Sequence, residues 1–428
     1  MRKFLLPAIT AAILAAASRP PDITFRVRMI DPGATETTAI ADINKDGLPD
    51  IVSGDSWYEA PSWKKHPIRE INFTSNYVDN FSDLVLDVDG DGYPDIVQFG
   101  YFSGNIVWLK NPGKNVASPS IREWKATEID HSGPTEFAFL VDLNNDGKAL
   151  EILPEFDRAT VPLAWFELKD HKWVKHVVSQ QSYGHGIGVG DINGDGRNDI
   201  LTPKGWFEAP PDPANGQWTF HPTDWETPPA PAARAGASPS PAPATPARTQ
   251  FGFMYAIDLN GDGRMDILTT AAHDYGIYWF EQMPAEPGRE TQWIRHTIDN
   301  SWSQAHASAL VDLNGDGQLD LVTGKRYMAH NGTDPGEKEP LGLYWYEYRK
   351  APVTGRGPGG NGGVEWVRHL IDYGGRMGAG LQVRVADIDG DGDLDIVAAG
   401  KSGLFIAENL TKSPKPATAR AVPGKPAH

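Results

Sequence analysis

The sequence contains no cysteine, and after its first residues it contains no long apolar run. Without cysteine, disulfide bonds, thiol catalysis and cysteine-ligated zinc are excluded. No internal segment is long and apolar enough to predict a transmembrane helix. Motifs of serine hydrolases, P-loop proteins and dinucleotide-binding proteins are also missing. A 428-residue chain without disulfides must gain its stability from its core or from bound ions.

The N-terminus has the pattern of a secretory signal. Two basic residues follow Met1, an apolar run extends from Phe4 to Ala17, and small residues stand at its end. This pattern predicts a signal peptide over residues 1–18 and a secreted or periplasmic protein.

The formal net charge is −17, and an acidic balance argues against nucleic acid as a partner. Much of the acidity lies in seven short segments, of which residues 387–395, with the sequence DIDGDGDLD, are the clearest. Each segment places oxygen-bearing side chains at positions one, three and five and glycine at position six. This spacing suits Ca²⁺, a hard cation that takes six to eight oxygen ligands.

Six of the seven segments also carry a carboxylate at position nine. In the third, Leu150 stands at that position and Glu151 follows one residue later, so this site is either rearranged or empty. The alternative for all seven is an acidic turn without metal. The predicted Ca²⁺ ligands are Asp42, Asn44, Asp46, Asp50, Asp87, Asp89, Asp91, Asp95, Asp142, Asn144, Asp146, Asp191, Asn193, Asp195, Asp199, Asp258, Asn260, Asp262, Asp266, Asp312, Asn314, Asp316, Asp320, Asp387, Asp389, Asp391 and Asp395.

Apolar, β-prone residues flank every segment, so each is expected to join two strands. Two further signatures recur between the segments: an aromatic pair followed by Glu, as in Trp57-Tyr58-Glu59, and a Trp-x-x-His pattern, as in Trp293 to His296. Four strands per unit and seven units predict an all-β, seven-bladed β-propeller with four antiparallel strands per blade. The last unit lacks its fourth strand, and residues 25–31 match that strand, so the N-terminal strand is expected to close the last blade.

The predicted propeller spans residues 23–410. A tract rich in Pro, Ala and Ser over residues 227–248 is predicted to be a disordered insert, and residues 411–428 a disordered tail.

These segments and signatures resemble the FG-GAP/VCBS repeats of integrin α-subunit heads and of many secreted bacterial proteins. The two aromatic signatures are most similar to bacterial VCBS proteins related to the propeller of aldos-2-ulose dehydratase. The resemblance implies a calcium-binding propeller. Its members include adhesion modules, lectin-like binders and sugar-modifying enzymes, so it leaves the activity open.

A candidate site follows from comparing the repeats. The position six residues before the first Asp of each segment is the expected start of the innermost strand. Its seven occupants are Glu36, Phe81, Glu136, His185, Gly252, His306 and Leu381, of which the two Glu and the two His are ionisable. Different ionisable residues at one equivalent position of a repeat suggest a functional site there. The alternative is that these positions are exposed strand starts, which tolerate any polar residue. The second connection of each unit should bring further groups to the same face, among them His273, Tyr275 and Arg326. By contrast, His66, His176, His221, His296 and His369 recur at one position and are expected to be structural.

Two functions remain open, and with them whether the protein is an enzyme. The first is a secreted module that binds a carbohydrate or protein ligand, expected to be a monomer. The second is a carbohydrate-active lyase or dehydratase that acts by β-elimination on the face opposite the calcium loops. In that mechanism His185 or His306 is the base, Arg326 holds the carboxylate or enolate, Tyr275 is the acid, and His273 lies beside them. The two His and two Glu of the ring could instead bind a transition metal.

Overall fold

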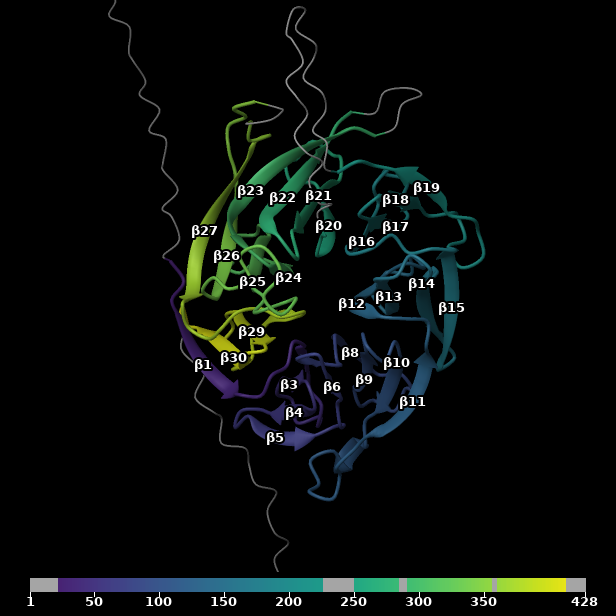
Figure 1. Ribbon diagram of the computed structural model, residues 1–428, viewed down its shortest axis with the longest axis vertical. Coiled ribbons are helices and arrows are strands. Elements are labelled where there is room, and N and C mark those ends of the chain that lie inside the picture. The colour runs from purple at the N-terminus through teal and green to yellow at the C-terminus, as the bar shows by residue number, and fades with distance from the viewer. Residues whose placement is uncertain (1–21, 226–249, 285–290, 356–359, 413–428) are drawn as a thin grey trace, which may run out of the picture.

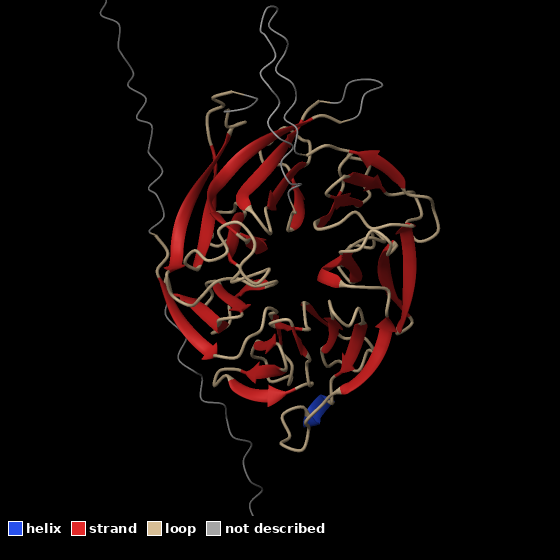
Figure 2. Ribbon diagram, in the orientation of Figure 1, coloured by secondary structure: helices blue, strands red, loops and turns tan. Residues whose placement is uncertain are grey.

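The computed structural model describes residues 22–225, 250–284, 291–355 and 360–412. The predicted signal peptide (1–18), the predicted insert (227–248) and nearly all of the predicted tail (411–428) lie outside these ranges, so those assignments stay predictions. The described residues contain thirty strands and one short 3₁₀ helix, η1 (Gly113–Asn115), so the protein is all-β (Figure 2). They contain no helix with the length and hydrophobicity needed to cross a lipid bilayer.

The sheets stand around a central axis in a β-propeller arrangement (Figure 1). Five of them have four strands each. Their strands, in chain order within each sheet, are β2 (Ala39–Ala41), β3 (Asp50–Ser53), β4 (Ser56–Glu59) and β5 (Lys64–Pro67); β8 (Ser82–Leu86), β9 (Asp95–Phe99), β10 (Ile106–Lys110) and β11 (Lys125–Asp130); β12 (Thr135–Val141), β13 (Glu151–Phe156), β14 (Leu163–Lys169) and β15 (Lys172–Ser179); β24 (Ala305–Val311), β25 (Asp320–Lys325), β26 (Gly342–Lys350) and β27 (Val364–Tyr373); and β28 (Val383–Ala386), β29 (Asp395–Gly400) and β30 (Gly403–Asn409) with β1 (Phe25–Asp31).

The sixth sheet has eight strands. It combines two antiparallel runs of four, joined by a parallel pairing of β16 with β20. Its strands are β16 (Ile187–Gly190), β17 (Asp199–Thr202), β18 (Gly205–Glu208), β19 (Thr219–Pro222), β20 (Phe253–Ile257), β21 (Asp266–Thr270), β22 (Tyr275–Gln282) and β23 (Trp293–Ser303). A separate two-stranded hairpin, β6 (Phe73–Thr74) and β7 (Tyr77–Val78), lies between the first two sheets along the chain.

The last sheet has the order β1-β30-β29-β28, so the N-terminal strand is its outermost member. Phe25 pairs with Asn409 and Met29 with Phe405 in an antiparallel ladder. The expectation that the N-terminal strand completes the last sheet is therefore confirmed. This pairing joins the two ends of the described chain.

Each acidic segment connects the first strand of its four-stranded run to the second, as expected. The first strands lie nearest the axis, where β8 contacts β12 and β2, and β24 contacts β28 (Figure 1). The acidic segments therefore share one face of the ring, which we call the loop face. The opposite face, where the first strands begin, is called the site face.

The two aromatic signatures meet on the outer strands. Trp57 on β4 pairs with His66 on β5, their rings stack with centroids 4.4 Å apart, and His66 Nε2 lies 2.8 Å from Glu59 Oε2. The same stack and the same His–Glu contact occur at His176, His221, His296 and His369. These five histidines thus hold the third strand to the fourth, which confirms their structural role.

Apolar side chains fill the spaces between neighbouring sheets. One cluster joins Val322 and Trp345 to Ile396 and Phe405, which come from the sheet of β24–β27 and from the last sheet. Burial of such clusters supplies the main stabilisation, at roughly 25 cal/mol per Å² of apolar area.

Candidate functional site

The ring of positions that the repeat comparison singled out lies on the site face. Its apolar members Phe81 and Leu381 pack with Tyr77 on one side of the axis. At Gly252 a side chain would meet His306 O at 2.9 Å and Thr270 Oγ1 at 2.7 Å, so the position has no room for one. The remaining four members, Glu36, Glu136, His185 and His306, are buried and come together.

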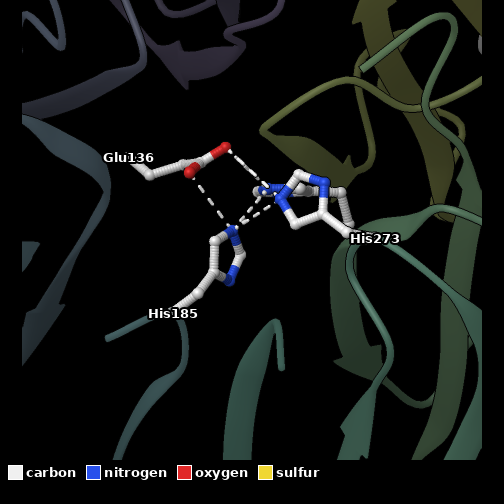
Figure 3. A group of neighbouring side chains, drawn as sticks. Glu136, His185 and His273 are labelled. Carbon is white, nitrogen blue, oxygen red and sulfur yellow. Dashed lines mark hydrogen bonds and ion pairs between the residues drawn. The ribbon is translucent and has the colours of Figure 1, made fainter. Parts of the chain in front are cut away.

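Three imidazoles converge on Glu136, a residue of β12. The Nε2 atom of His185 lies 3.2 Å from Glu136 Oε2, and the Nε2 atom of His306 lies 3.1 Å from Glu136 Oε1. His273, from the connection between β21 and β22, places its Nε2 atom 3.0 Å from His185 Nε2 (Figure 3). The four groups offer ligand atoms that all lie within 4.8 Å of one another. We call Glu136, His185, His273 and His306 the histidine cluster.

Hydrogen bonds on the far side of two rings fix their tautomers. His185 Nδ1 lies 2.7 Å from the carbonyl oxygen of Phe251, which can only accept, so Nδ1 carries the proton. His273 Nδ1 lies 3.0 Å from Asp334 Oδ2 and donates to this carboxylate in the same way. Both rings, when neutral, therefore direct an Nε2 lone pair toward the other at 3.0 Å. Two lone pairs at this distance repel unless a proton or a cation lies between them.

Burial and neighbouring charges set the protonation of the cluster. Burial lowers the pKa of His273 to about 4, and burial together with the positive charge of Arg326 holds the pKa of His306 well below its usual value. For Glu136, burial opposes ionisation, but its contacts with His185 and His306 outweigh burial and hold its pKa well below the usual range. At neutral pH His273 and His306 are thus neutral and Glu136 is ionised, which are the forms in which such groups bind metal.

The donor set fits a transition metal. Three imidazole nitrogens and one carboxylate match the ligands of zinc sites, and in a tetrahedral site with bonds of about 2.0–2.1 Å the ligand atoms lie about 3.3 Å apart. The separations of 3.0–3.2 Å from His185 Nε2 to the other three groups are close to that value, and His273 Nε2 lies farther from Glu136 Oε1, at 3.8 Å. Calcium prefers oxygen ligands and does not suit this set.

Arg326, which follows β25, supports the carboxylate side of the cluster. Its Nη1 donates to Glu136 Oε1 at 2.9 Å, and its Nε and Nη2 donate to the two carboxylate oxygens of Glu36 at 2.8 and 3.2 Å. The side chain of Arg326 is 1% exposed. These contacts tie the guanidinium to two protein carboxylates, whereas the sequence suggested that it would hold a ligand.

A cavity of about 260 Å³ opens above Glu136 and Arg326. One wall is aromatic, with Phe81 stacked on Tyr101 at 4.9 Å between ring centroids. The other lining residues come from the β6–β7 hairpin, from the segment after Tyr101 and from the connection that follows Arg326: Ser75, Tyr77, Phe102, His330 and Asn331. The cavity is slightly smaller than typical pockets for drug-sized ligands, and its apolar walls with a few polar groups at the base have the character of a site for a small organic ligand.

Residues 327–341, here called the cover segment, border this cavity. Tyr275, predicted as a catalytic acid, donates a hydrogen bond from its hydroxyl to Glu339 Oε1 of this segment at 2.6 Å. The structure thus places Tyr275 at an anchor of the cover segment, whereas His185, His273, His306 and Arg326 all lie in or against the histidine cluster. Tyr101 lines the cavity, and its hydroxyl donates a hydrogen bond to Asp157 Oδ2 at 2.6 Å.

Comparison of the repeats did not select Tyr101, His330, Asp334 or Glu155 as site residues. Asp334 lies in an insertion without counterparts in other units, so no repeat position marked it. Burial, with the nearby charges of Asp157 and Glu136, raises the pKa of Glu155 well above its usual value. The sequence feature that could have identified Glu155 is its place in the apolar strand β13, where the other units have apolar residues or Thr.

The acidic segments on the loop face have the predicted turn. All seven glycines at position six have φ between 83° and 94°, a region that glycine enters without strain: Gly47, Gly92, Gly147, Gly196, Gly263, Gly317 and Gly392. Carboxylates converge within 4.8 Å in two of the segments, at Asp87, Asp89 and Asp95 and at Asp387, Asp389 and Asp395.

Several oxygens of these segments fit a cation. Asp89 Oδ1, Asp142 Oδ1 and Asp391 Oδ2 are buried, and no hydrogen-bond donor reaches them within the described residues. An ion with oxygen ligands would satisfy such atoms. In three segments a basic side chain also approaches the carboxylates, namely Lys110 at Asp89, Arg197 at Asp195 and Arg264 at Asp262.

The carboxylate at position nine has a second role, because it accepts two backbone hydrogen bonds. Asp50 accepts from Ile43 N at 3.0 Å and from Ala60 N at 2.8 Å. In the third segment Glu151 accepts from Leu143 N at 3.1 Å. In the strand ladder Asp50 pairs with Ala41, the residue just before the first Asp of its segment. Glu151 pairs with Val141, which stands just before the first Asp of the third segment. The third segment is therefore rearranged: it is one residue longer, and Glu151 occupies the place of the missing Asp.

Comparisons with known proteins agree with this architecture. The model of the FG-GAP-like repeat matches residues 87–153 and 258–323. No curated protein matches the sequence. Among solved structures, BBS1N in complex with ARL6DN is similar with a TM-score of 0.50 and 9% identity, over 92% of this chain and 98% of that chain.

Two further structures are more distant in shape. They are a lectin of Agrocybe aegerita that recognises non-reducing terminal N-acetylglucosamine (TM-score 0.44, 16% identity, 82% of this chain and 81% of that chain) and the V. cholerae biofilm matrix protein Bap1 (TM-score 0.42, 11% identity, 92% of both chains). Identities this low concern the fold and leave the function open. The arrangement of the sheets shows that this chain is a β-propeller protein, and the two matches show that it contains FG-GAP-like repeats.

Proposed function

We propose that this protein binds a divalent transition-metal ion in the histidine cluster and uses this centre to act on a small hydroxylated or carboxylated ligand in the adjoining cavity. The observation that carries the proposal is the pair of imidazoles of His185 and His273, whose Nδ1 atoms are held by Phe251 and Asp334 and whose Nε2 atoms face each other at 3.0 Å beside Glu136. A metal ion turns this repulsive arrangement into a stable one.

The reaction that this site favours is β-elimination from a sugar or a sugar acid. A bound metal supplies positive charge that stabilises a developing enolate. In this assignment His185 and His306 are metal ligands, so neither is free to act as the base. His330 takes that role, because it lines the cavity and its Nδ1 is held 2.9 Å from Asp334 Oδ1, which leaves Nε2 as the proton acceptor.

The remaining steps use groups of the same cavity. His330 accepts the proton from the carbon beside the carbonyl or carboxylate, and the electron pair left behind forms the new carbon–carbon double bond. The hydroxyl group on the next carbon leaves with a proton and becomes water. Tyr101 is the candidate donor of that proton, because this residue lines the cavity and a hydrogen bond to Asp157 holds its hydroxyl in place.

A ligand-binding module without catalysis is the second candidate. The stacked pair Phe81 and Tyr101 favours it, since aromatic faces pack against the apolar face of a sugar ring as well in a binding site as in an enzyme. The ligand would then be a carbohydrate or a group of similar size on a protein partner.

We further infer that the propeller has seven blades. The two runs of the eight-stranded sheet pack against each other through an apolar cluster that includes Leu201, Trp206, Met254 and Phe280, just as separate sheets do elsewhere in the ring. Counting each run as one blade adds two to the five separate sheets. The β16–β20 pairing then joins the inner edges of two neighbouring blades.

Calcium in the acidic segments and secretion are part of the same proposal. The buried oxygens without donors and the left-handed glycines support the calcium sites. The N-terminal sequence pattern alone supports secretion.

Two measurements test the proposed function. Purified protein is dialysed against 1,10-phenanthroline with excess Ca²⁺ present, reloaded with Zn²⁺ or Mn²⁺, and analysed for bound metal beside His185→Ala and His306→Ala variants. We expect one transition-metal ion per chain in the parent protein and none in either variant. The loaded protein is then incubated with acidic polysaccharides and keto-sugars while the near-ultraviolet absorbance of unsaturated products is followed.

A parent protein that holds no transition metal at the cluster would refute the metal centre. Metal-dependent growth of absorbance would support elimination. Ligand binding without such growth would leave the binding module as the function.

A further inference from the structure

Asp334 of the cover segment contacts two histidines of the site at once. Its Oδ2 lies 3.0 Å from His273 Nδ1, and its Oδ1 lies 2.9 Å from His330 Nδ1. The two imidazoles stack on each other with centroids 4.3 Å apart and planes within 10°. One carboxylate thus orients a member of the histidine cluster and a residue that lines the cavity.

The cover segment holds Asp334 in this position through its own hydrogen bonds. The buried side chain of Glu337 accepts from the backbone N–H of Asp334 at 2.7 Å and from that of Gly332. Asn331 donates to Ser75 O at 3.2 Å, which connects the segment to the β6–β7 hairpin on the other side of the cavity. The place of Asp334 therefore depends on the segment that borders the cavity.

His273 differs from the other two imidazoles in needing such support. His185 is tied to the backbone oxygen of Phe251, and His306 lies within strand β24. His273 comes from the connection after β21, and the contact that orients its Nδ1 atom comes from a residue 61 positions later. A ligand on a connection can rotate away from a metal more easily than one on a strand.

We infer that Asp334 is a positioning residue of the metal centre, which orients His273 as a ligand through a carboxylate that the cover segment supplies. The inference rests on the proposed function, because it requires a metal ion in the histidine cluster. A carboxylate behind a ligating imidazole fixes the ring and raises its basicity, and its loss typically weakens metal binding 10–100-fold.

The test compares metal binding by the full-length protein and three variants, with Ca²⁺ in excess so that the acidic segments stay loaded. Asp334→Ala removes the carboxylate. Glu339→Gln is the matched control, since it removes a charge from the same segment and weakens the Tyr275 anchor without touching His273. Asp334→Asn keeps an oxygen acceptor. Zn²⁺ affinity is measured by competition with a chromogenic chelator, and Co²⁺ is used as a probe of coordination through its visible absorption.

For Asp334→Ala we expect a Zn²⁺ affinity lower by about 10–100-fold and a changed Co²⁺ spectrum, for Asp334→Asn a smaller loss, and for Glu339→Gln the affinity and spectrum of the parent. An Asp334→Ala protein with parental affinity and spectrum would overturn the inference while leaving the metal centre intact. Equal losses in Asp334→Ala and Glu339→Gln would also overturn it, because they would point to general loosening of the segment. Absence of binding in the parent would instead refute the proposed function.

Discussion

Replacing Glu136 by Gln separates the metal-binding role of this carboxylate from its role in the ion pair, because Glu36 provides a matched control. Both carboxylates accept hydrogen bonds from Arg326, and both side chains are almost fully buried, with exposed fractions of 6% for Glu136 and 4% for Glu36. Only Glu136 also contacts His185 and His306. The two substitutions therefore remove the same charge from the same guanidinium and differ in what they do to the imidazoles.

The expected loss of stability is similar for the two variants. Removing one partner from a buried ion pair costs about 3–5 kcal/mol, and we expect the lower end because Arg326 keeps its second carboxylate. With an unfolding entropy of about 2 cal/mol/K per residue, about 3 kcal/mol corresponds to a Tm lower by about 4 °C for a domain of this size. Thermal unfolding of the metal-free proteins, with Ca²⁺ present, measures this value.

The expected effects on metal binding differ. Loss of an outer partner lowers metal affinity about 10–100-fold, so loss of a direct ligand in Glu136→Gln should lower Zn²⁺ affinity by more than about 100-fold. Glu36→Gln acts only through Arg326 and should change the affinity by less than about 10-fold. Equal Zn²⁺ affinities for the two variants, with equal Tm values, would show that Glu136 serves the ion pair alone and would refute its role as a ligand.

The other predictions concern the loop face and the outer strands. Burial raises the pKa of the position-nine carboxyl to about 7 in Asp50, Asp199, Asp266, Asp320 and Asp395. Without calcium, these raised pKa values favour the fold at low pH, and that contribution is lost as the pH rises from about 4 to about 7. The gain in Tm from saturating Ca²⁺ should therefore be larger at about pH 8 than at about pH 5, and a gain independent of pH would contradict this reasoning. On the outer strands, His296→Ala should lower the free energy of unfolding by about 2–3 kcal/mol and His221→Ala by about 1 kcal/mol, as measured by chemical denaturation. Both variants lose the stack on Trp and the contact with Glu. The costs differ because the His296 side chain is 4% exposed and that of His221 is 27% exposed. Equal costs would show that burial does not strengthen the contact.

The sequence by itself determined the features that depend on local chemistry and on repetition. Alternate acidic residues with a glycine at position six specify a tight turn wherever they occur, and flanking apolar residues make strands of their neighbours. Comparing the repeats located the polar ring, because Glu36, Glu136, His185 and His306 break a pattern that is otherwise apolar or small. The match of residues 25–31 to an outer strand identified the closing strand for the same reason.

Only the tertiary structure decided which of these groups meet and what they do. Glu136, His185, His273 and His306 come from different units, so their convergence depends on how the ring closes and not on their spacing in the chain. The tautomers that expose two lone pairs are set by Phe251 and Asp334, which no repeat pattern marks. Likewise, Glu151 replaces the missing Asp because the turn before it is one residue longer while the strand register stays the same, so that Glu151 pairs with Val141. Contacts between residues distant in sequence fix the chemistry of this site, and such contacts exist only once the chain has folded.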